Sequence, residues 1–161
     1  MAHCDKKHIR LRNFDYASEN AYFITIKVKD GRHHLGKVRN GIMGLSEIGN
    51  KASLLLQEIP ILHPYVHIDK FMVMPNHVHC ILEIISKPKN INYKNAYGKP
   101  VPGSVSVLIN QYKGAVKKWC NENGYEWFQW QKRFHDSVIR DEDAFRKISL
   151  YIENNPRKWR P

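Results

Sequence analysis

Acidic residues are missing from one long stretch of this 161-residue chain. Between Glu83 and Glu122 there is none, while the same interval holds seven lysines. The whole chain carries 26 Lys and Arg residues against 15 Asp and Glu, which gives a formal net charge of +11. Unbalanced positive charge of this kind presents an electrostatic surface to a polyanion. We therefore expect nucleic acid as a partner, with an ordinary solvated surface as the alternative.

Long apolar runs and closely spaced cysteines are also absent. No stretch is long enough to span a bilayer, and the first residues, Met-Ala-His-Cys-Asp-Lys-Lys-His, contain no apolar signal core. Cys4, Cys80 and Cys120 have neither paired nor metal-binding spacing, which is typical of reduced thiols. We therefore expect a cytoplasmic protein without a membrane partner. Its charge further suggests association with the nucleoid.

The hydrophobic pattern predicts one domain over residues 1–161. We expect strands at 21–28, 66–74, 77–85 and 132–139, with a short extended piece near 42–45. Helices are expected at 46–59, 104–123 and 141–155, a basic N-terminal arm at 1–20, a basic loop at 86–103 and an aromatic-rich segment at 125–131. Proline residues are expected to end the first and last helices. The order β-α-β-β-α-β with one further helix predicts the α+β class and a ferredoxin-like antiparallel sheet. In that topology the strand at 77–85 is central.

Two histidines stand one residue apart at the start of this central strand. Side chains at i and i+2 of a strand point to the same face. His77 and His79 should therefore share a face with Ile81 and Glu83, while the apolar residues that alternate with them pack on the helices. Two adjacent imidazoles can bind one cation. The alternative is a pair of incidental polar residues on a half-exposed strand.

Tyr151 and Asn155 are four residues apart on the last expected helix, so they point the same way. If this side overlies the histidine face, the amide oxygen of Asn155 can be a third metal ligand and Tyr151 stands beside the metal. Spacing alone favours simpler interpretations, namely a half-buried packing tyrosine and a helix C-cap before proline.

Four sequence motifs add a resemblance that covers nearly the whole chain. They are Val73-Met-Pro-Asn-His-Val-His-Cys-Ile81, Trp130-Gln-Lys-Arg-Phe134, Val138-Ile-Arg-Asp-Glu-Asp143 and Tyr151-Ile-Glu-Asn-Asn-Pro156. Together they resemble the single-tyrosine HUH transposases, in particular the branch of REP-associated tyrosine transposases. The opening Ile9-Arg-Leu-Arg-Asn-Phe-Asp-Tyr16 is similar to that branch as well. The resemblance implies a ferredoxin-like fold and an enzyme that nicks and joins single-stranded DNA.

The resemblance also implies roles for individual residues. His77 and His79 match the metal-binding pair, Tyr151 matches the nucleophile that forms a 5′-phosphotyrosine, and Asn155 matches a further metal ligand. Many relatives carry a histidine where this chain has Ser137, and His135 lies two residues earlier. We assign a catalytic role to neither. The expected cofactor is a divalent cation, Mg2+ or Mn2+, which neutralises charge on the phosphodiester.

The expected partner is single-stranded or hairpin DNA, with palindromic elements as targets. The candidates for contact with its backbone are Arg10, Arg12, Lys113, Lys117, Lys132 and Arg133, and Tyr93 or Tyr97 is a candidate for stacking on bases. Two other functions stay open, a non-catalytic nucleic-acid-binding module and a small metal-dependent nucleotide hydrolase. The sequence also leaves open whether the protein is a monomer or a homodimer, and whether Tyr151 acts within one subunit or across two.

Overall fold

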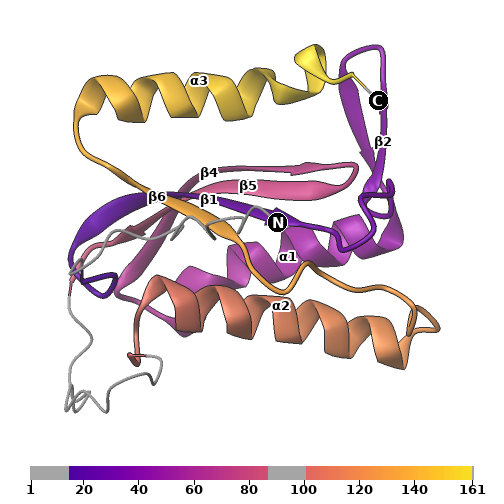
Figure 1. Cartoon of the computed structure of the whole chain (residues 1–161), viewed down its shortest axis with the longest axis horizontal. Helices are drawn as coiled ribbons and strands as arrows, with labels where there is room; N and C mark the ends of the chain where they lie inside the picture. The colour runs from indigo at the N-terminus through magenta and orange to yellow at the C-terminus, as the bar shows by residue number, and fades with distance from the viewer. Residues whose placement is uncertain (1–14, 87–100, 161) are drawn as a thin grey trace, which may run out of the picture.

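The fold is built on one four-stranded sheet, seen in a computed structural model that describes residues 15–86 and 101–160 (Figure 1). Strands β1 (Asn20–Lys27), β4 (Val66–Met74), β5 (His77–Ile84) and β6 (His135–Ile139) are arranged in the order β4-β5-β1-β6. Every neighbouring pair is antiparallel. Helices α1 (Glu47–Leu62) and α2 (Val105–Glu122) cover one face, and α3 (Glu142–Lys158) lies across the other (Figure 1). This topology confirms the predicted ferredoxin-like fold with an additional C-terminal helix, and it places β5 in the centre.

Two apolar clusters hold the layers together, and they differ in size. The larger cluster joins the sheet to α1 and α2 and includes Val78, Cys80 and Leu82 of β5. The smaller cluster has three buried residues, Ile81, Ile139 and Ile152, and it attaches α3 to the opposite face. These alternating positions of β5 confirm the predicted division of its side chains. Among the described helices, α3 alone covers the face that carries the histidines.

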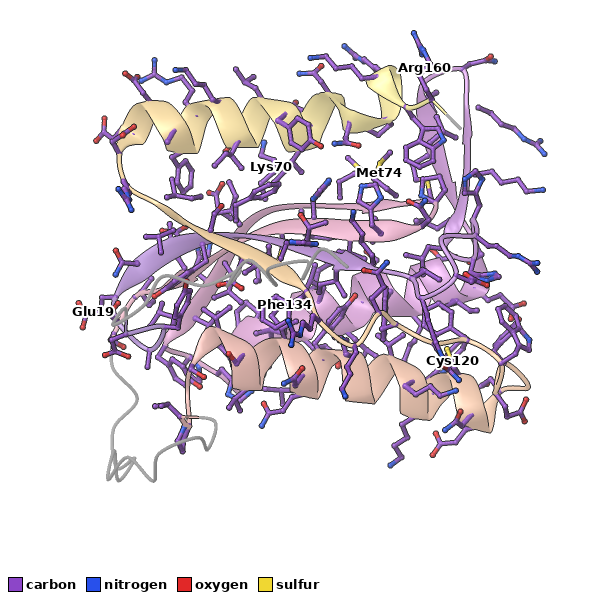
Figure 2. The ribbon with its side chains drawn as sticks, in the orientation of Figure 1. Glu19, Lys70, Met74, Cys120, Phe134 and Arg160 are labelled. Atoms are coloured by element: carbon purple, nitrogen blue, oxygen red, sulfur yellow. The ribbon has the colours of Figure 1, made fainter. Side chains whose placement is uncertain are left out.

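Polar contacts add little to the attachment of α3. Lys70 of β4 lies between the sheet and this helix (Figure 2). Its Nζ is 3.7 Å from Oε2 of Glu153, and the two side chains are 39% and 62% exposed. Ion pairs in such exposed positions contribute about 0–1 kcal/mol. The apolar contacts of Ile152 and its neighbours are therefore the main cause of the docking.

A β-hairpin is inserted between β1 and α1. It consists of β2 (Gly36–Arg39) and β3 (Ile42–Leu45), of which the sequence analysis predicted only an extended piece near the second strand. Asn40 and Gly41 connect the strands with φ angles of 52° and 73°. Two consecutive positive φ angles are typical of the tight Asn-Gly hairpin turn. The signal for the hairpin was therefore present in the sequence.

The predicted ends of two helices were wrong. Proline was expected to terminate them, yet Pro60 lies inside α1 and Pro156 inside α3, so that the last helix ends at Lys158 instead of residue 155. Each proline is within three residues of the helix end, so little helix follows the position where the N–H is missing. The carbonyl of Pro156 still accepts a hydrogen bond from the backbone N–H of Trp159. No helix in the described part of the chain is long and apolar enough to cross a membrane.

Candidate active site

The two histidines of β5 lie side by side on the face beneath α3. Their ring centroids are 4.5 Å apart, with the planes at 70°. His79 is only 5% exposed, and His77 is partly buried. Val78, between them, belongs to the core on the other side of the sheet. The predicted common face is confirmed, and the two imidazoles are close enough to act together.

Neighbouring side chains hold each imidazole by its Nδ1 atom. Nδ1 of His77 is 2.7 Å from Oδ1 of Asn76, and because an amide oxygen only accepts, the imidazole is the donor. Nδ1 of His79 is 2.9 Å from Oγ1 of Thr25, its cross-strand partner on β1. An imidazole that donates from Nδ1 carries its lone pair on Nε2, where it is available to a metal. The contacts of Asn76 and Thr25 therefore suit a pair of oriented metal ligands.

Both imidazoles are neutral at physiological pH. Burial lowers the pKa of His77 to about 4, and the Lys27 ammonium contributes to this shift. Burial also lowers the pKa of His79 to about 3, with smaller contributions from His77 and Lys27. Only the neutral form of histidine binds a metal, so proton competition at neutral pH is weak.

Helix α3 brings Tyr151 to the same place. Its ring centroid is 5.4 Å from that of His79, with the planes at 65°. Phe23 of β1 stacks on His79 at 5.2 Å and contacts Tyr151 edge-on at 6.1 Å. The Tyr151 side chain nevertheless stays 47% exposed. A phenol that is packed on one side and open on the other can meet a substrate from solvent.

These groups surround a cavity of about 570 Å3. Its lining combines the histidines and Tyr151 with Trp159, His135, Lys27, Gln131 and residues of the loop after β1. Trp159, at the C-cap of α3, has its ring centroid 5.9 Å from that of His77. His135 lies on β6 opposite Thr25 and also lines the cavity, whereas Ser137 does not. Helix α3 thus contributes the Tyr151 ring to this cavity, and its C-cap contributes the Trp159 ring.

Asn155, the predicted third metal ligand, lies on the buried side of α3 and is 8% exposed. It follows Tyr151 by four residues, as predicted, but it is not among the residues that line the cavity. Its role therefore stays a prediction.

The predicted DNA-contacting residues are spread over several environments. The Lys113 ammonium donates to the backbone carbonyls of Gln131 and Lys132, and that of Lys117 to the carbonyl of Glu126. Lys132 and Arg133 are exposed. Arg10, Arg12, Tyr93 and Tyr97 lie outside the described residues. The first two lysines thus fix the segment between α2 and β6, and all the proposed DNA contacts stay predictions.

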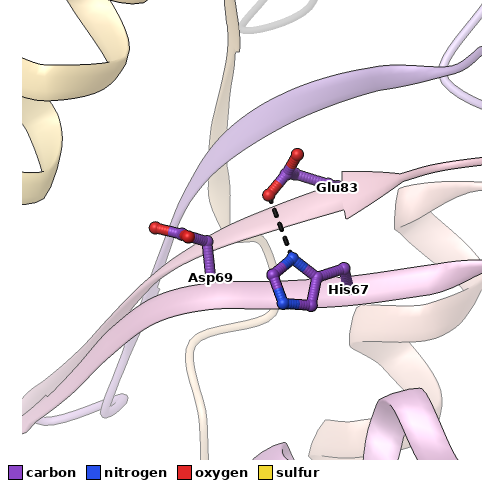
Figure 3. A group of neighbouring side chains, drawn as sticks. All are labelled: His67, Asp69 and Glu83. Carbon is purple, nitrogen blue, oxygen red and sulfur yellow. Dashed lines mark hydrogen bonds and ion pairs between the residues drawn. The ribbon is translucent and has the colours of Figure 1, made fainter.

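A second group of possible metal ligands was missed by the sequence analysis. His67, Asp69 and Glu83 converge from β4 and β5 (Figure 3), with one ligand atom of each within 4.8 Å of the others. Nδ1 of His67 is 3.1 Å from Oε1 of Glu83. The β4–β5 register shifts between Ile68 and Lys70, which leaves Asp69 as an extra residue in its strand. Such a bulge changes the direction of a side chain. No turn residue in the sequence predicts a bulge at this position.

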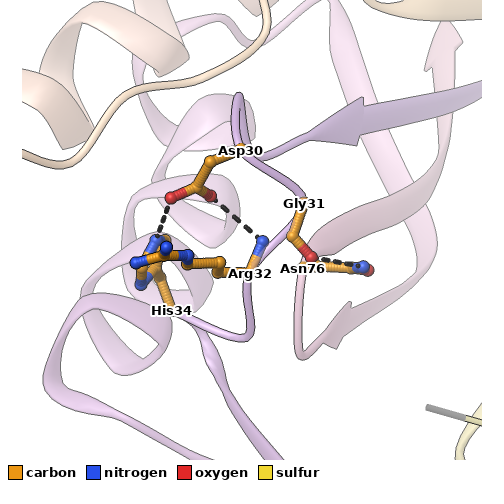
Figure 4. A network of polar contacts seen from close by, with 5 residues as sticks. All are labelled: Asp30, Gly31, Arg32, His34 and Asn76. Atoms are coloured by element: carbon orange, nitrogen blue, oxygen red, sulfur yellow. Dashed lines mark hydrogen bonds and ion pairs between the residues drawn. The ribbon is translucent and has the colours of Figure 1, made fainter.

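The loop after β1 is ordered by a small polar network (Figure 4). The Asp30 carboxylate accepts a hydrogen bond from the backbone N–H of Arg32 and lies 2.8 Å from Nε2 of His34. Nδ2 of Asn76 donates to the carbonyl of Gly31 at 3.0 Å. Asn76 therefore contacts both His77 and this loop, so it links the histidine strand to the cavity wall.

Comparison with known proteins shows the family of the chain. An uncharacterized protein of Haemophilus influenzae (strain Rd) is 33% identical over an alignment of 161 positions, which covers 96% of this chain and 89% of the relative. No family model matches the chain.

Among solved structures, the chain is similar to a REP-associated tyrosine transposase bound to a REP hairpin. The TM-score is 0.64 at 21% identity, and the match covers 92% of this chain and 73% of the other. This likeness confirms the arrangement of sheet and helices that the motifs predicted. The chain belongs to one family with the Haemophilus influenzae protein, and its fold is that of a REP-associated tyrosine transposase.

Proposed function

We propose that this protein is a transposase-like enzyme that cleaves and rejoins single-stranded DNA through a 5′-phosphotyrosine intermediate. The observation that carries the proposal is the position of Tyr151, whose ring lies 5.4 Å from that of His79 over a cavity that both imidazoles line. A nucleophile beside two neutral metal ligands is an arrangement suited to metal-assisted phosphodiester cleavage through a covalent intermediate. The proposed targets are the palindromic DNA elements suggested by the sequence motifs. We propose that the protein acts on them in the chromosome, in the cytoplasm.

His77 and His79 are the proposed metal-binding residues, with Asn155 as a third. Their donor set fits a divalent cation because the imidazoles are neutral and oriented by Asn76 and Thr25. Mg2+ or Mn2+ bound there would neutralise charge on the non-bridging phosphate oxygens.

Tyr151 performs the covalent step. Its phenolic oxygen attacks phosphorus, a P–O bond to Tyr151 forms, and the bond to the 3′ oxygen of the preceding nucleotide breaks. The phenolic proton is lost to solvent, and the 3′ oxygen gains a proton to become a hydroxyl. Because the new linkage is again a phosphodiester, a 3′-hydroxyl can reverse the step and join strands.

The proposal places the reacting side chains in one subunit. It is supported by the Tyr151 and His79 rings of one chain, whose centroids are 5.4 Å apart. Mixing Tyr151→Phe protein with His77→Ala protein distinguishes the two possibilities. We expect no recovered activity, whereas recovery would mean that the site is shared across a dimer.

Tyr151→Phe is the direct test of the nucleophile. The variant keeps the ring that packs on Phe23 and His79 and removes only the hydroxyl. Incubated with single-stranded hairpin DNA and Mn2+, it should bind DNA and form no covalent adduct on a denaturing gel. Tyr65→Phe, which deletes the same atom from a partly buried tyrosine outside the cavity, should form the adduct normally. A wild-type protein that binds hairpin DNA but never forms an adduct would instead indicate a non-catalytic binding module.

A further inference from the structure

Trp127 has an unusual position for a tryptophan. It lies between α2 and β6, and its side chain is 55% exposed, whereas nearby Trp130 is 8% exposed. The Trp127 ring lies against His34, with centroids 4.6 Å apart and planes at 58°. Tyr125 and Phe128 meet it at steep angles, 86° and 72°. The surrounding rings therefore fix the indole while more than half of its surface stays open.

The backbone under this indole is held at several points. Nζ of Lys117 donates to the carbonyl of Glu126 at 2.6 Å. The backbone N–H of Lys29 donates to the carbonyl of Gln129 at 2.9 Å, and the N–H of Gln131 to that of Lys27 at 2.8 Å. A fixed aromatic surface loses little conformational entropy when a ligand binds.

The imidazole of His34, which lies against Trp127, is fixed as well. His34 is held by Asp30, whose carboxylate lies 2.8 Å from Nε2 of the imidazole (Figure 4). His34 is also 6.3 Å from Phe128 between ring centroids, so it contacts two aromatic rings of the same segment. The indole thus rests on a second ring that is itself hydrogen-bonded.

The segment that carries Trp127 also reaches the histidine cavity. Val28, Gly31 and Gln131 line that cavity, and Val28 pairs with Trp130 in an isolated β-bridge. Gln131 follows Trp127 by four residues, at most about 14 Å along the chain. One segment therefore reaches from the exposed indole to the wall of the candidate active site.

The charge of this region suits a polyanion. The segments 27–34 and 126–133 carry five cationic residues, Lys27, Lys29, Arg32, Lys132 and Arg133, against two acidic residues, Asp30 and Glu126. Proteins that bind single strands combine such basic surfaces with aromatic rings on which bases stack.

We propose that Trp127 is a stacking platform for an unpaired base of the DNA strand that enters the histidine cavity. The inference rests on the proposed function, because it takes single-stranded DNA as the substrate. The stacking adds affinity with little dependence on base identity, since every base has a π face.

Binding of fluorescein-labelled single-stranded DNA to the full chain in EDTA tests this platform without cleavage. Trp127→Ala should weaken binding at least about fivefold, and Trp127→Phe should keep most of the affinity. Ile61→Ala, which removes another exposed apolar side chain (77% exposed) at the end of α1, should bind like the wild type. Equal affinity of Trp127→Ala and the wild type would overturn the proposal.

Substrates with a single abasic nucleotide give a second measurement that does not depend on the folding of a variant. One abasic position should weaken wild-type binding by the same factor as Trp127→Ala, and it should cause no further loss in that variant. The proposal fails if no abasic position weakens wild-type binding.

The adduct assay separates this proposal from the proposed function. An adduct on Tyr151 together with unchanged binding by Trp127→Ala would refute the stacking role of Trp127 and support the proposed enzyme function. Weakened binding by Trp127→Ala without any adduct from wild-type protein would support the stacking role of Trp127 and refute the proposed enzyme function.

Discussion

Two histidine-bearing groups occupy the same face of the sheet, one toward each end of β5. The first group, His77 and His79, is buried, neutral and fixed by hydrogen bonds to Asn76 and Thr25. The second group, His67 with Asp69 and Glu83, is largely exposed, and its imidazole already pairs with a carboxylate. The first group has Tyr151 beside it, with its ring centroid 5.4 Å from that of His79.

The difference shows that the number of possible ligands is a poor guide to a reactive site. The exposed group has more charged donors, yet its carboxylates are solvated and need no cation. The buried pair has fewer donors, but its geometry is fixed before any ligand arrives. Preorganised ligands on rigid strands are what a catalytic metal requires.

Removing one imidazole from each group should give the largest contrast. His77→Ala or His79→Ala should abolish cleavage of hairpin DNA in Mn2+ while leaving DNA binding largely intact, because binding depends on phosphate contacts. His67→Ala should cleave normally. Single-turnover cleavage and binding of the same oligonucleotide measure both effects. If His67→Ala alone lost cleavage, the functional roles of the two groups would be reversed.

The hydrogen-bonding partners should matter only at the buried pair. Asn76→Ala and Thr25→Val should each weaken Mn2+ binding about 10- to 100-fold, since loss of such contacts frees the imidazole to rotate. Titration calorimetry of the DNA-free protein measures this. Glu83→Gln, which removes the partner of His67, serves as the control and should leave Mn2+ affinity unchanged. A drop caused by Glu83→Gln would show that the exposed group binds the measured metal.

Phosphate contacts should likewise concentrate at the buried pair's end of the sheet. Lys132 and Arg133 follow Gln131 of the cavity wall and are exposed. Replacing both by Gln should make the dependence of log affinity on log salt shallower by about 1.4, the value for two phosphate contacts on a single strand. Lys70→Gln, beside the exposed group, should leave the slope unchanged. An unaltered slope in the double variant would place the DNA elsewhere.

Acid should destabilise the protein through the buried pair. Between pH 6.5 and about 4 the unfolded chain protonates His77 and His79, whereas the folded chain keeps them neutral because burial lowers their pKa. The unfolded state therefore binds more protons. As the pH decreases through this range, the free energy of unfolding decreases by up to about 1.4 kcal/mol per pH unit for each imidazole. Urea unfolding in EDTA should show a weaker pH dependence for His77→Gln.

The smallest effect is expected from the exposed pair itself. Glu83→Gln breaks the 3.1 Å contact with His67 and should change the free energy of unfolding by less than about 1 kcal/mol, because both groups remain hydrated. Thermal unfolding at low and high salt measures this. A larger loss would indicate that the bulge at Asp69 depends on this pair.

The sequence predicted the buried pair because its information is local. The alternation from His77 to Ile84 determines which side chains share a face, and the predicted α+β topology then places that strand in the centre. The same alternation identified Ile81 for the histidine face. The prediction that Tyr151 lies near His79 was weaker. Helical spacing indicates on which side of α3 a residue lies, but it does not give the distance of that helix from the sheet.

Other features depend on contacts that sequence does not encode locally. The bulge at Asp69 arises from the register of β4 against β5, so the convergence of His67, Asp69 and Glu83 was not predictable. Lys113 and Lys117 were predicted from charge alone, but the carbonyls that they reach belong to residues that follow after a turn in the chain. Trp127 was seen only as part of an aromatic-rich segment, because its exposure results from how that segment folds back.

The unequal size of the two apolar clusters has a consequence for dynamics. The histidines belong to the sheet, which the larger cluster stabilises, whereas Tyr151 belongs to α3, which is attached mainly through Ile81, Ile139 and Ile152. Segments with few buried contacts undergo local unfolding at lower free energy than the global transition. Amide hydrogen exchange should therefore be faster throughout α3 than in β5. The nucleophile can then leave and rejoin its partners by undocking one helix, while the rest of the domain stays folded.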